Sequence, residues 1–171
     1  MKRQWLLLSL ILGLSFTIQA QNDPLPASDV DYDEFMRLSQ EVDEYRKSRL
    51  IDLQTFQQMA QEEGVLILDT RSKSAYKQKH IKGAVHLNFS DFTEKKLAKL
   101  IPSPNTKILI YCNNNFEQDP MHFARKSAPL ALNIPTFINL YGYGYKNLFE
   151  LADLIPVDDD RLEFEGKAVE D

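Results

Sequence analysis

Cys112 is the residue with the clearest capacity for chemistry, and it is the one cysteine of the 171-residue chain. It follows the apolar run at residues 107–111 and precedes a polar stretch at residues 113–119. A cysteine thiolate is a nucleophile, and it can also carry a transferred group. A lone cysteine cannot form a disulfide within its own chain, so this thiol is either an inert core residue or a reactive one.

The segment after Cys112 favours a reactive thiol. Asp119 and Pro120 are typical of a helix start, so we expect a helix over residues 120–132 that Pro129 ends or kinks. The amides of the loop and the start of that helix would then face the sulfur and favour its thiolate. The predicted active-site loop comprises Asn113, Asn114, Asn115, Phe116 and Glu117.

The composition of this loop also raises a conflict. Asparagines tolerate left-handed backbone geometry and can replace glycine in shaping a cradle of amides. The carboxylates of Glu117 and Asp119 would raise the pKa of the sulfur if they pointed inward, and they would repel an anionic substrate. We expect the fixed amides to prevail, which would make Cys112 solvent-reachable and more acidic than a free thiol.

Other chemistries lack the residues that they need. A phosphatase of the Cys-x5-Arg type requires arginine at position 118, where this chain has Gln118. The three histidines and the single cysteine show no zinc-ligand spacing, so we expect no metal. There is no glycine-rich phosphate-binding loop, and we expect no cofactor. The formal net charge of −5 disfavours nucleic acid as a partner.

The elements that must position Cys112 alternate between strands and helices. Apolar runs predict strands at residues 50–51, 65–68, 85–87, 107–111 and 136–140. Helical spacing and capping residues predict helices at residues 53–60, 74–78, 91–100, 120–132 and 146–154. This alternation predicts an α/β fold with a mostly parallel sheet, in which ligands bind at the carboxyl ends of the strands.

Two stretches and one junction resemble the rhodanese-like domain family. The stretches are Leu68-Asp69-Thr70-Arg71 and His80-Ile81-Lys82-Gly83-Ala84, with Tyr76 between them. The junction is the strand at residues 107–111 that runs into Cys112. The resemblance spans residues 50–154 and implies a three-layer fold with a central, mostly parallel sheet flanked by helices. The loop after Cys112 departs from the family pattern, because it has no glycine, carries acids and is longer.

The resemblance implies a function and a set of roles. Cys112 would accept a sulfane sulfur as a persulfide and pass it on, with a small sulfur-containing anion or an acceptor thiol as partner. Asp69, Arg71, His80 and Gly83 would be scaffold residues. The alternative is a catalytically weak or inactive rhodanese-like module that binds a protein partner or a small anion in the periplasm.

The two ends of the chain differ from its middle. Residues 1–20 combine a positive start, an apolar run and a small residue, Ala20, which is the layout of a cleaved signal peptide. We therefore expect an exported protein, periplasmic or secreted, with no membrane span after processing. Residues 21–30 are expected to be a linker, residues 31–49 an amphipathic helix, residues 50–155 the domain and residues 156–171 an acidic flexible tail.

Overall fold

The computed structural model describes residues 25–170. The predicted signal peptide and residues 21–24 of the predicted linker lie outside this range. Residues 25–30 are exposed and have no helix or strand. Asp31 begins the compact unit that contains all the elements described below.

The centre of this unit is a sheet of five parallel strands in the order β1-β7-β5-β2-β4. The strands are β1 (Leu50–Ile51), β2 (Leu66–Asp69), β4 (Val85–His86), β5 (Ile108–Tyr111) and β7 (Leu148–Leu151). Leu68 of β2 lies opposite Ile110 of β5, and both side chains are fully buried. Strands covered on both faces are apolar throughout, which explains the unbroken runs in the sequence.

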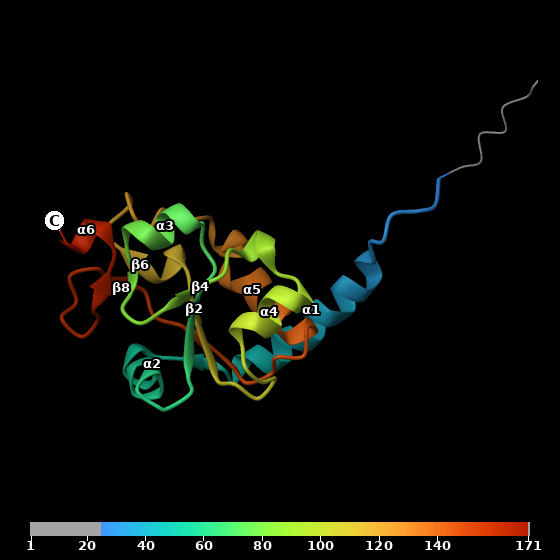
Figure 1. The fold of residues 1–171 in the computed structure, drawn as a ribbon, viewed down its shortest axis with the longest axis horizontal. Coiled ribbons are helices and arrows are strands. Elements are labelled where there is room, and N and C mark those ends of the chain that lie inside the picture. Colours follow the sequence, from blue (N-terminus) through green and yellow to red (C-terminus); the bar gives the residue numbers. More distant parts are fainter. Residues whose placement is uncertain (1–24, 171) are drawn as a thin grey trace, which may run out of the picture. The chain divides into compact units, whose positions relative to one another are not determined.

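Helices cover both faces of this sheet (Figure 1). One face packs against α1 (Tyr32–Lys47), α4 (Glu94–Leu100) and α5 (Asn133–Gly142), with Leu97 and Phe137 in that core. The other face packs against α2 (Leu53–Ala60), with Leu53 and Phe56 in a second core. The structure is therefore the three-layer α/β fold that the sequence predicts. No helix among residues 25–170 is long and apolar enough to cross a membrane.

Short elements complete the fold around the carboxyl ends of the strands. The helices are α3 (Lys73–Gln78) and α6 (Lys167–Glu170), and 3-10 turns span Phe89–Asp91, Asn113–Asn115 and Ala128–Leu130. The strand β3 (His80–Ile81) pairs antiparallel with β9 (Phe164–Glu165). The strand β6 (Phe116–Glu117) pairs parallel with β8 (Ile155–Pro156).

Two predicted elements have the wrong type. Residues 136–140, predicted as a strand, belong to α5, and residues 148–151, predicted as part of a helix, form β7. Short apolar runs cannot be assigned to helix or strand by periodicity, and tertiary packing decides between them. Pro135 is compatible with α5 because it lies in the first turn, where its missing N–H costs no helical hydrogen bond.

Two helix starts also differ from the prediction. Residues 120–132 form no α-helix and contain only the 3-10 turn at Ala128–Leu130. Most of their side chains are exposed, so no apolar face drives helix formation there. The start of α4 is capped by the Thr93 hydroxyl, which accepts from the amide of Lys96, whereas Asp91 lies in the preceding 3-10 turn.

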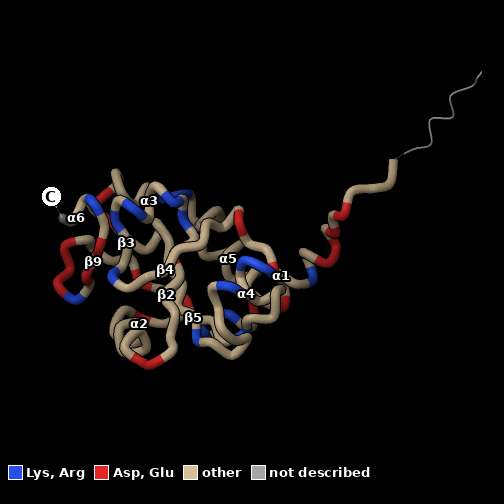
Figure 2. Tube along the Cα trace, in the orientation of Figure 1, with Lys and Arg blue, Asp and Glu red and all other residues tan. Residues whose placement is uncertain are grey.

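The C-terminal segment packs against the domain, although its acidic composition predicts a flexible tail. Figure 2 shows acidic residues along the segment between β8 and β9. The segment nevertheless returns to the domain, where Leu162 is buried and Phe164 lies 5.4 Å from Phe116 and 5.5 Å from Phe123, measured between ring centroids. A few apolar side chains at the right positions anchor an otherwise polar stretch.

Candidate active site around Cys112

Cys112 directly follows the central strand β5, at the carboxyl edge of the sheet. Its Sγ accepts a hydrogen bond from the amide of Asn114 at 3.4 Å. The amides of Leu132 and Asn133, at the start of α5, also stabilise its thiolate. These N–H groups come from the loop after Cys112 and from the start of α5, and not from a helix beginning at Pro120, which does not form.

The thiol itself is neither exposed nor acidic. Cys112 is 1% exposed, and burial raises its pKa above the ordinary value. The amides of Asn114, Asn133 and Leu132 lower this pKa without offsetting the burial, and the negative charge of Glu150 raises it further. The expectation of a solvent-reachable, acidic thiol is wrong for this conformation. Burial raises the pKa of Cys112 by more than the three backbone amides together lower it.

The three asparagines after Cys112 act through their side chains. Asn113 donates to the carbonyl of Ala124 at 2.9 Å, while Asn114 donates to the carbonyl of Lys126 at 2.7 Å and accepts from its amide at 3.1 Å. Among the non-glycine residues that the structure describes, only Gln118 has a positive φ. The asparagines therefore fasten the following loop and do not provide left-handed backbone.

Asn115 connects the ends of two neighbouring strands. Its Oδ1 accepts from the amide of Cys112 at 2.8 Å, and its Nδ2 donates to the carbonyls of Leu151 at 2.8 Å and Asp153 at 3.2 Å. These bonds fix the backbone of Cys112 relative to β7. The position of the sulfur is thus set by hydrogen bonds on both sides of it.

Neither loop acid, Glu117 or Asp119, is among the groups that raise the pKa of Cys112. Glu117 lies in β6 opposite Pro156. Asp119 forms an ion pair with Lys79 at 3.1 Å and a hydrogen bond with the ring of His122 at 2.9 Å. The acid that acts on Cys112 is Glu150, from the middle of β7.

A cavity of about 230 Å³ adjoins Cys112. Its polar lining comes from Arg46, Cys112, Asn114, Asn115, Asn133 and Glu150. Arg46 donates from Nε and Nη2 to the two carboxylate oxygens of Glu150, at 2.5 Å each. Glu150 is 4% exposed, so the guanidinium compensates a buried charge beside the thiol.

A buried hydrogen-bond network surrounds Arg71 and Asp69 at the end of β2. Arg71 donates to the Asp69 carboxylate at 2.7 Å, and the hydroxyl of Tyr111 donates to the same carboxylate at 2.6 Å. Arg71 also donates to Asn113 Oδ1 at 3.3 Å and to the His122 carbonyl at 3.1 Å. This network links the end of β2 to the segment that follows Cys112, and it leaves the guanidinium fully engaged.

His80 and Gly83 lie farther from the sulfur. The Nδ1–H of His80 donates to the carbonyl of Tyr76 at 2.6 Å, and the two rings stack at 3.8 Å. Gly83 has φ +79°, a conformation that favours glycine, in the turn between β3 and β4. Neither residue lines the cavity at Cys112.

Comparison with known proteins identifies the family. Residues 52–152 match the family model described as the Rhodanese-like domain. The chain belongs to the rhodanese-like domain family. No curated protein sequence matches it.

Solved structures resemble this rhodanese-like domain at low sequence identity. A protein from Bacillus halodurans is 18% identical, with a TM-score of 0.51 over 75% of this chain and 86% of that one. A rhodanese-like domain from an Anabaena species is 21% identical, with a TM-score of 0.48 over 71% and 81%. A rhodanese from E. coli, solved with anions, is 18% identical, with a TM-score of 0.39 over 60% and 98%. The likeness to the Bacillus halodurans protein shows the fold alone.

Three residues that line this rhodanese-like site were not predicted from the sequence. Arg46 lies on α1, outside the residues that the family model matches, and Asn133 and Glu150 lie in the two elements whose types were predicted wrongly. A glutamate within the apolar run 148–151 is the one signal that could have drawn attention, since carboxylates are seldom buried without a partner.

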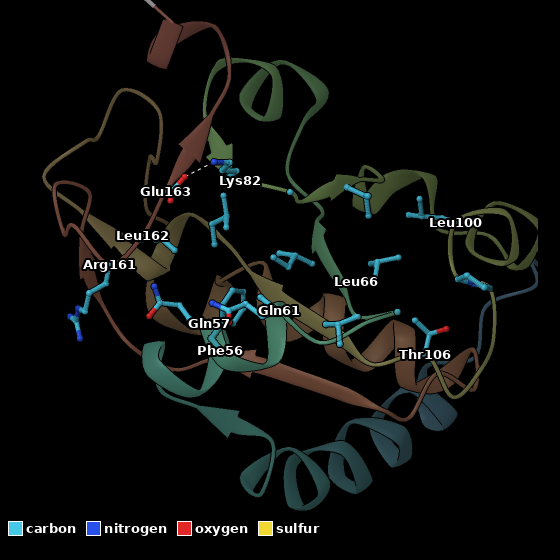
Figure 3. A pocket seen from close by; sticks show the side chains of 18 residues that line it. Phe56, Gln57, Gln61, Leu66, Lys82, Leu100, Thr106, Arg161, Leu162 and Glu163 are labelled. Carbon is cyan, nitrogen blue, oxygen red and sulfur yellow. Dashed lines mark hydrogen bonds and ion pairs between the residues drawn. The ribbon is translucent and has the colours of Figure 1, made fainter.

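A larger cavity of the rhodanese-like domain lies away from Cys112. It measures about 580 Å³ and lies between α2 and β2, with Phe56, Leu66 and Thr106 in its wall (Figure 3). Leu66 begins β2 and Thr106 precedes β5, so this cavity lies at the opposite end of the sheet from Cys112. Within residues 25–170 no cluster of three or more His, Cys, Asp or Glu residues could hold a metal ion.

Proposed function

We propose that Cys112 carries a sulfane sulfur as a persulfide and transfers it to an acceptor. The Cys112 thiolate attacks the outer sulfur of a small donor such as thiosulfate, the donor's sulfur–sulfur bond breaks, and its remaining fragment leaves with the electron pair. An acceptor thiol then attacks the terminal sulfur, and the Cys112–sulfur bond breaks to regenerate Cys112. This reaction needs no cofactor or metal.

The observation that carries the proposal is the set of three amides around one sulfur. The N–H groups of Asn114, Leu132 and Asn133 come from two segments and stabilise negative charge at the Cys112 sulfur. A persulfide anion needs such donors, because fixed amides stabilise charge without reorganising. The adjoining cavity of about 230 Å³ leaves room for a terminal sulfur.

The raised pKa of Cys112 predicts slow sulfur transfer at neutral pH. Only the thiolate attacks the donor, so a thiol that stays protonated at neutral pH reacts slowly. The cavity also offers no uncompensated cation to an anionic donor, because Arg46 is paired with Glu150. We therefore propose a slow, protected sulfur carrier and not a rapid thiosulfate-consuming enzyme.

A second candidate is a binding module without turnover. The burial of Cys112 to 1% exposure favours this alternative, because an inert core thiol has the same signature. Its partner would be a small molecule or a protein.

Intact-mass spectrometry after incubation with thiosulfate or with inorganic polysulfide separates the two candidates. A carrier gains the mass of one sulfur atom, loses it to added thiol, and fails to gain it as the Cys112→Ser variant. A folded wild-type chain that gains no sulfur from either donor up to high pH would leave the binding module.

We further propose that the chain is exported and that the domain works in the periplasm or outside the cell. The layout of residues 1–20 supports this proposal. A protected thiol suits that setting, because an exposed one would be oxidised or paired there.

A further inference from the structure

A chain of hydrogen bonds connects α1 with the backbone of Cys112. The two carboxylate oxygens of Glu150 accept from the Arg46 guanidinium at 2.5 Å each, and Glu150 Oε1 also accepts from Asn133 Nδ2 at 3.3 Å. The same Nδ2 donates to Asn115 Oδ1 at 3.1 Å, and this oxygen accepts from the amide of Cys112 at 2.8 Å. Arg46 is therefore the far end of a continuous network that reaches the residue carrying the sulfur.

Asn133 is the member of this network that acts on the sulfur itself. It is the first residue of α5, and its backbone amide is one of the three that stabilise the Cys112 thiolate. Leu132, directly before it, contributes another of these amides, and its side chain does not cap the helix. The bonds of the Asn133 side chain to Glu150 and Asn115 therefore anchor the start of α5 and, with it, two amides of the cradle.

The guanidinium of Arg46 also balances the charge beside the thiol. Glu150 is 4% exposed, and its charge raises the pKa of Cys112. Within residues 25–170, Arg46 and Glu150 are the only charged side chains that line this cavity, while Asp43, on the same helix, also acts on the guanidinium. Without Arg46, the carboxylate would stay as an uncompensated buried charge or turn away from Asn133 toward water. The first outcome repels a thiolate, and the second loosens the start of α5.

We propose that Arg46 is a positioning residue for sulfur transfer and acts on Cys112 through Glu150 and Asn133. The inference rests on the proposed sulfur-carrier function and assigns part of its control to α1, which precedes the residues that the family model matches. This role requires no contact between Arg46 and the donor or the acceptor. The guanidinium holds the carboxylate, the carboxylate holds the start of α5, and the amides there stabilise the charged sulfur.

The pH profile of Cys112 alkylation by iodoacetamide tests this role in the Arg46→Ala variant. A glutamate is ionised at the alkaline pH where a thiol titrates, so the unpaired charge should move the profile upward by about one pH unit. Persulfide formation from inorganic polysulfide, followed by intact mass, should be about tenfold slower at neutral pH. Arg37→Ala, which removes an exposed guanidinium of the same helix, is the control and should change neither measurement. An unmoved profile in folded Arg46→Ala would overturn the inference.

The Glu150→Gln background separates positioning from a general loss of stability. Glutamine keeps an oxygen that can accept from Asn133, but it has no charge for Arg46 to balance. Adding Arg46→Ala to Glu150→Gln should therefore leave the alkylation profile where the single variant has it. Equal shifts in the two backgrounds would overturn the inference, because they would show that Arg46 does not act through Glu150.

Chemical rescue tests the guanidinium group directly. The Arg46 side chain is 29% exposed, so its place is open to solvent after truncation to alanine. Guanidinium at sub-denaturing concentration should restore the alkylation profile of Arg46→Ala, whereas urea, which has a similar shape and no charge, should not. Equal rescue by the two compounds, or by neither, would count against the inference. Arg46→Lys keeps the charge but not the two-pronged bond, so it should show part of the shift even if Arg46→Ala does not fold.

The alkylation measurement keeps this inference separate from the proposed function, because it requires no persulfide. If no persulfide ever forms, but Arg46→Ala moves the profile in the wild-type background alone, the positioning role holds and the carrier function fails. If Arg46→Ala forms the persulfide at the wild-type rate with an unmoved profile, the carrier function holds and the positioning role is wrong.

Discussion

The guanidinium of Arg46 holds the buried carboxylate of Glu150 through two hydrogen bonds of 2.5 Å. The two residues are 104 positions apart, and Arg46 lies on α1, before the residues that the family model matches. The helix that precedes the rhodanese-like domain thus completes the wall of the cavity at Cys112.

Replacing Arg46 should destabilise the fold. Arg46→Met leaves the Glu150 carboxylate buried without its cation, and we expect a loss of about 2 kcal/mol, the lower end for a broken buried pair because Arg46 is partly exposed. Urea denaturation measures the loss. Arg37→Met, on the same helix but in an exposed pair with Glu34, is the control and should change little. Equal effects of the two variants would show that the buried pair is not special.

The alkylation of Cys112 should require a higher pH in the folded protein than in the denatured chain. Because burial raises its pKa, the folded protein should react with iodoacetamide more slowly than the denatured chain, and the rise with pH should occur at higher pH. Labelling that matches the denatured chain at every pH would contradict the burial of this thiol. Cys112→Ser is the blank.

Neutralising Glu150 should make the thiol more acidic. The negative charge of Glu150 raises the pKa of Cys112, so Glu150→Gln should lower that pKa and speed alkylation at mildly alkaline pH. Glu117→Gln serves as the control, since Glu117 lies in β6 opposite Pro156, and it should leave the profile unchanged. The reverse order of effects would mean that the loop acid, as first expected from the sequence, is the one that acts on the sulfur.

Tyr111 should make the fold sensitive to alkali. Burial and then the Asp69 charge raise its pKa well above the ordinary value, so the unfolded chain ionises first as the pH rises. The stability that Tyr111 contributes is therefore present below about pH 10 and is lost as the pH climbs toward the folded-state pKa. Tyr111→Phe should lower the free energy of unfolding at pH 7 by about 1–3 kcal/mol, because Asp69 loses a donor, and it should flatten the alkaline loss. An unflattened alkaline loss in a folded variant would assign that loss to other groups.

The C-terminal segment should contribute to stability. Phe164 packs against the rings of both Phe116 and Phe123, and we expect Phe164→Ala to cost about 2 kcal/mol, less than for a fully buried ring. Val169→Ala in α6 removes an exposed side chain of the same segment and should cost much less. A chain indifferent to both changes would restore the expectation of a mobile tail.

The central strands could be predicted because a strand that is buried on both faces must be apolar at every position. The runs that became β2 and β5 are apolar without interruption, as strands covered on both faces must be. The place of Cys112 at the end of a strand followed from the same observation. These features are local, so a single sequence contains them.

The rest of the site depends on contacts between distant segments. Phe137 and Ile138 favour a strand by their residue types, yet they pack in the core as part of α5. Residues 146–154 were predicted as a helix, although Leu148–Leu151 form β7. The acidity of Cys112 was misjudged because burial depends on what the fold places over the sulfur. No spacing in the sequence indicates that residues 46, 133 and 150 meet beside residue 112.

The bonds from Asn113 and Asn114 to Ala124 and Lys126 have a practical consequence. They hold the two ends of the segment at residues 115–123 together. This segment can therefore change length without moving the backbone at Cys112. Met121, 85% exposed at the tip, is thus a suitable place to graft a reporter peptide or an affinity handle. A domain labelled there would be captured or imaged with its thiol site intact, which labelling through its only cysteine would destroy.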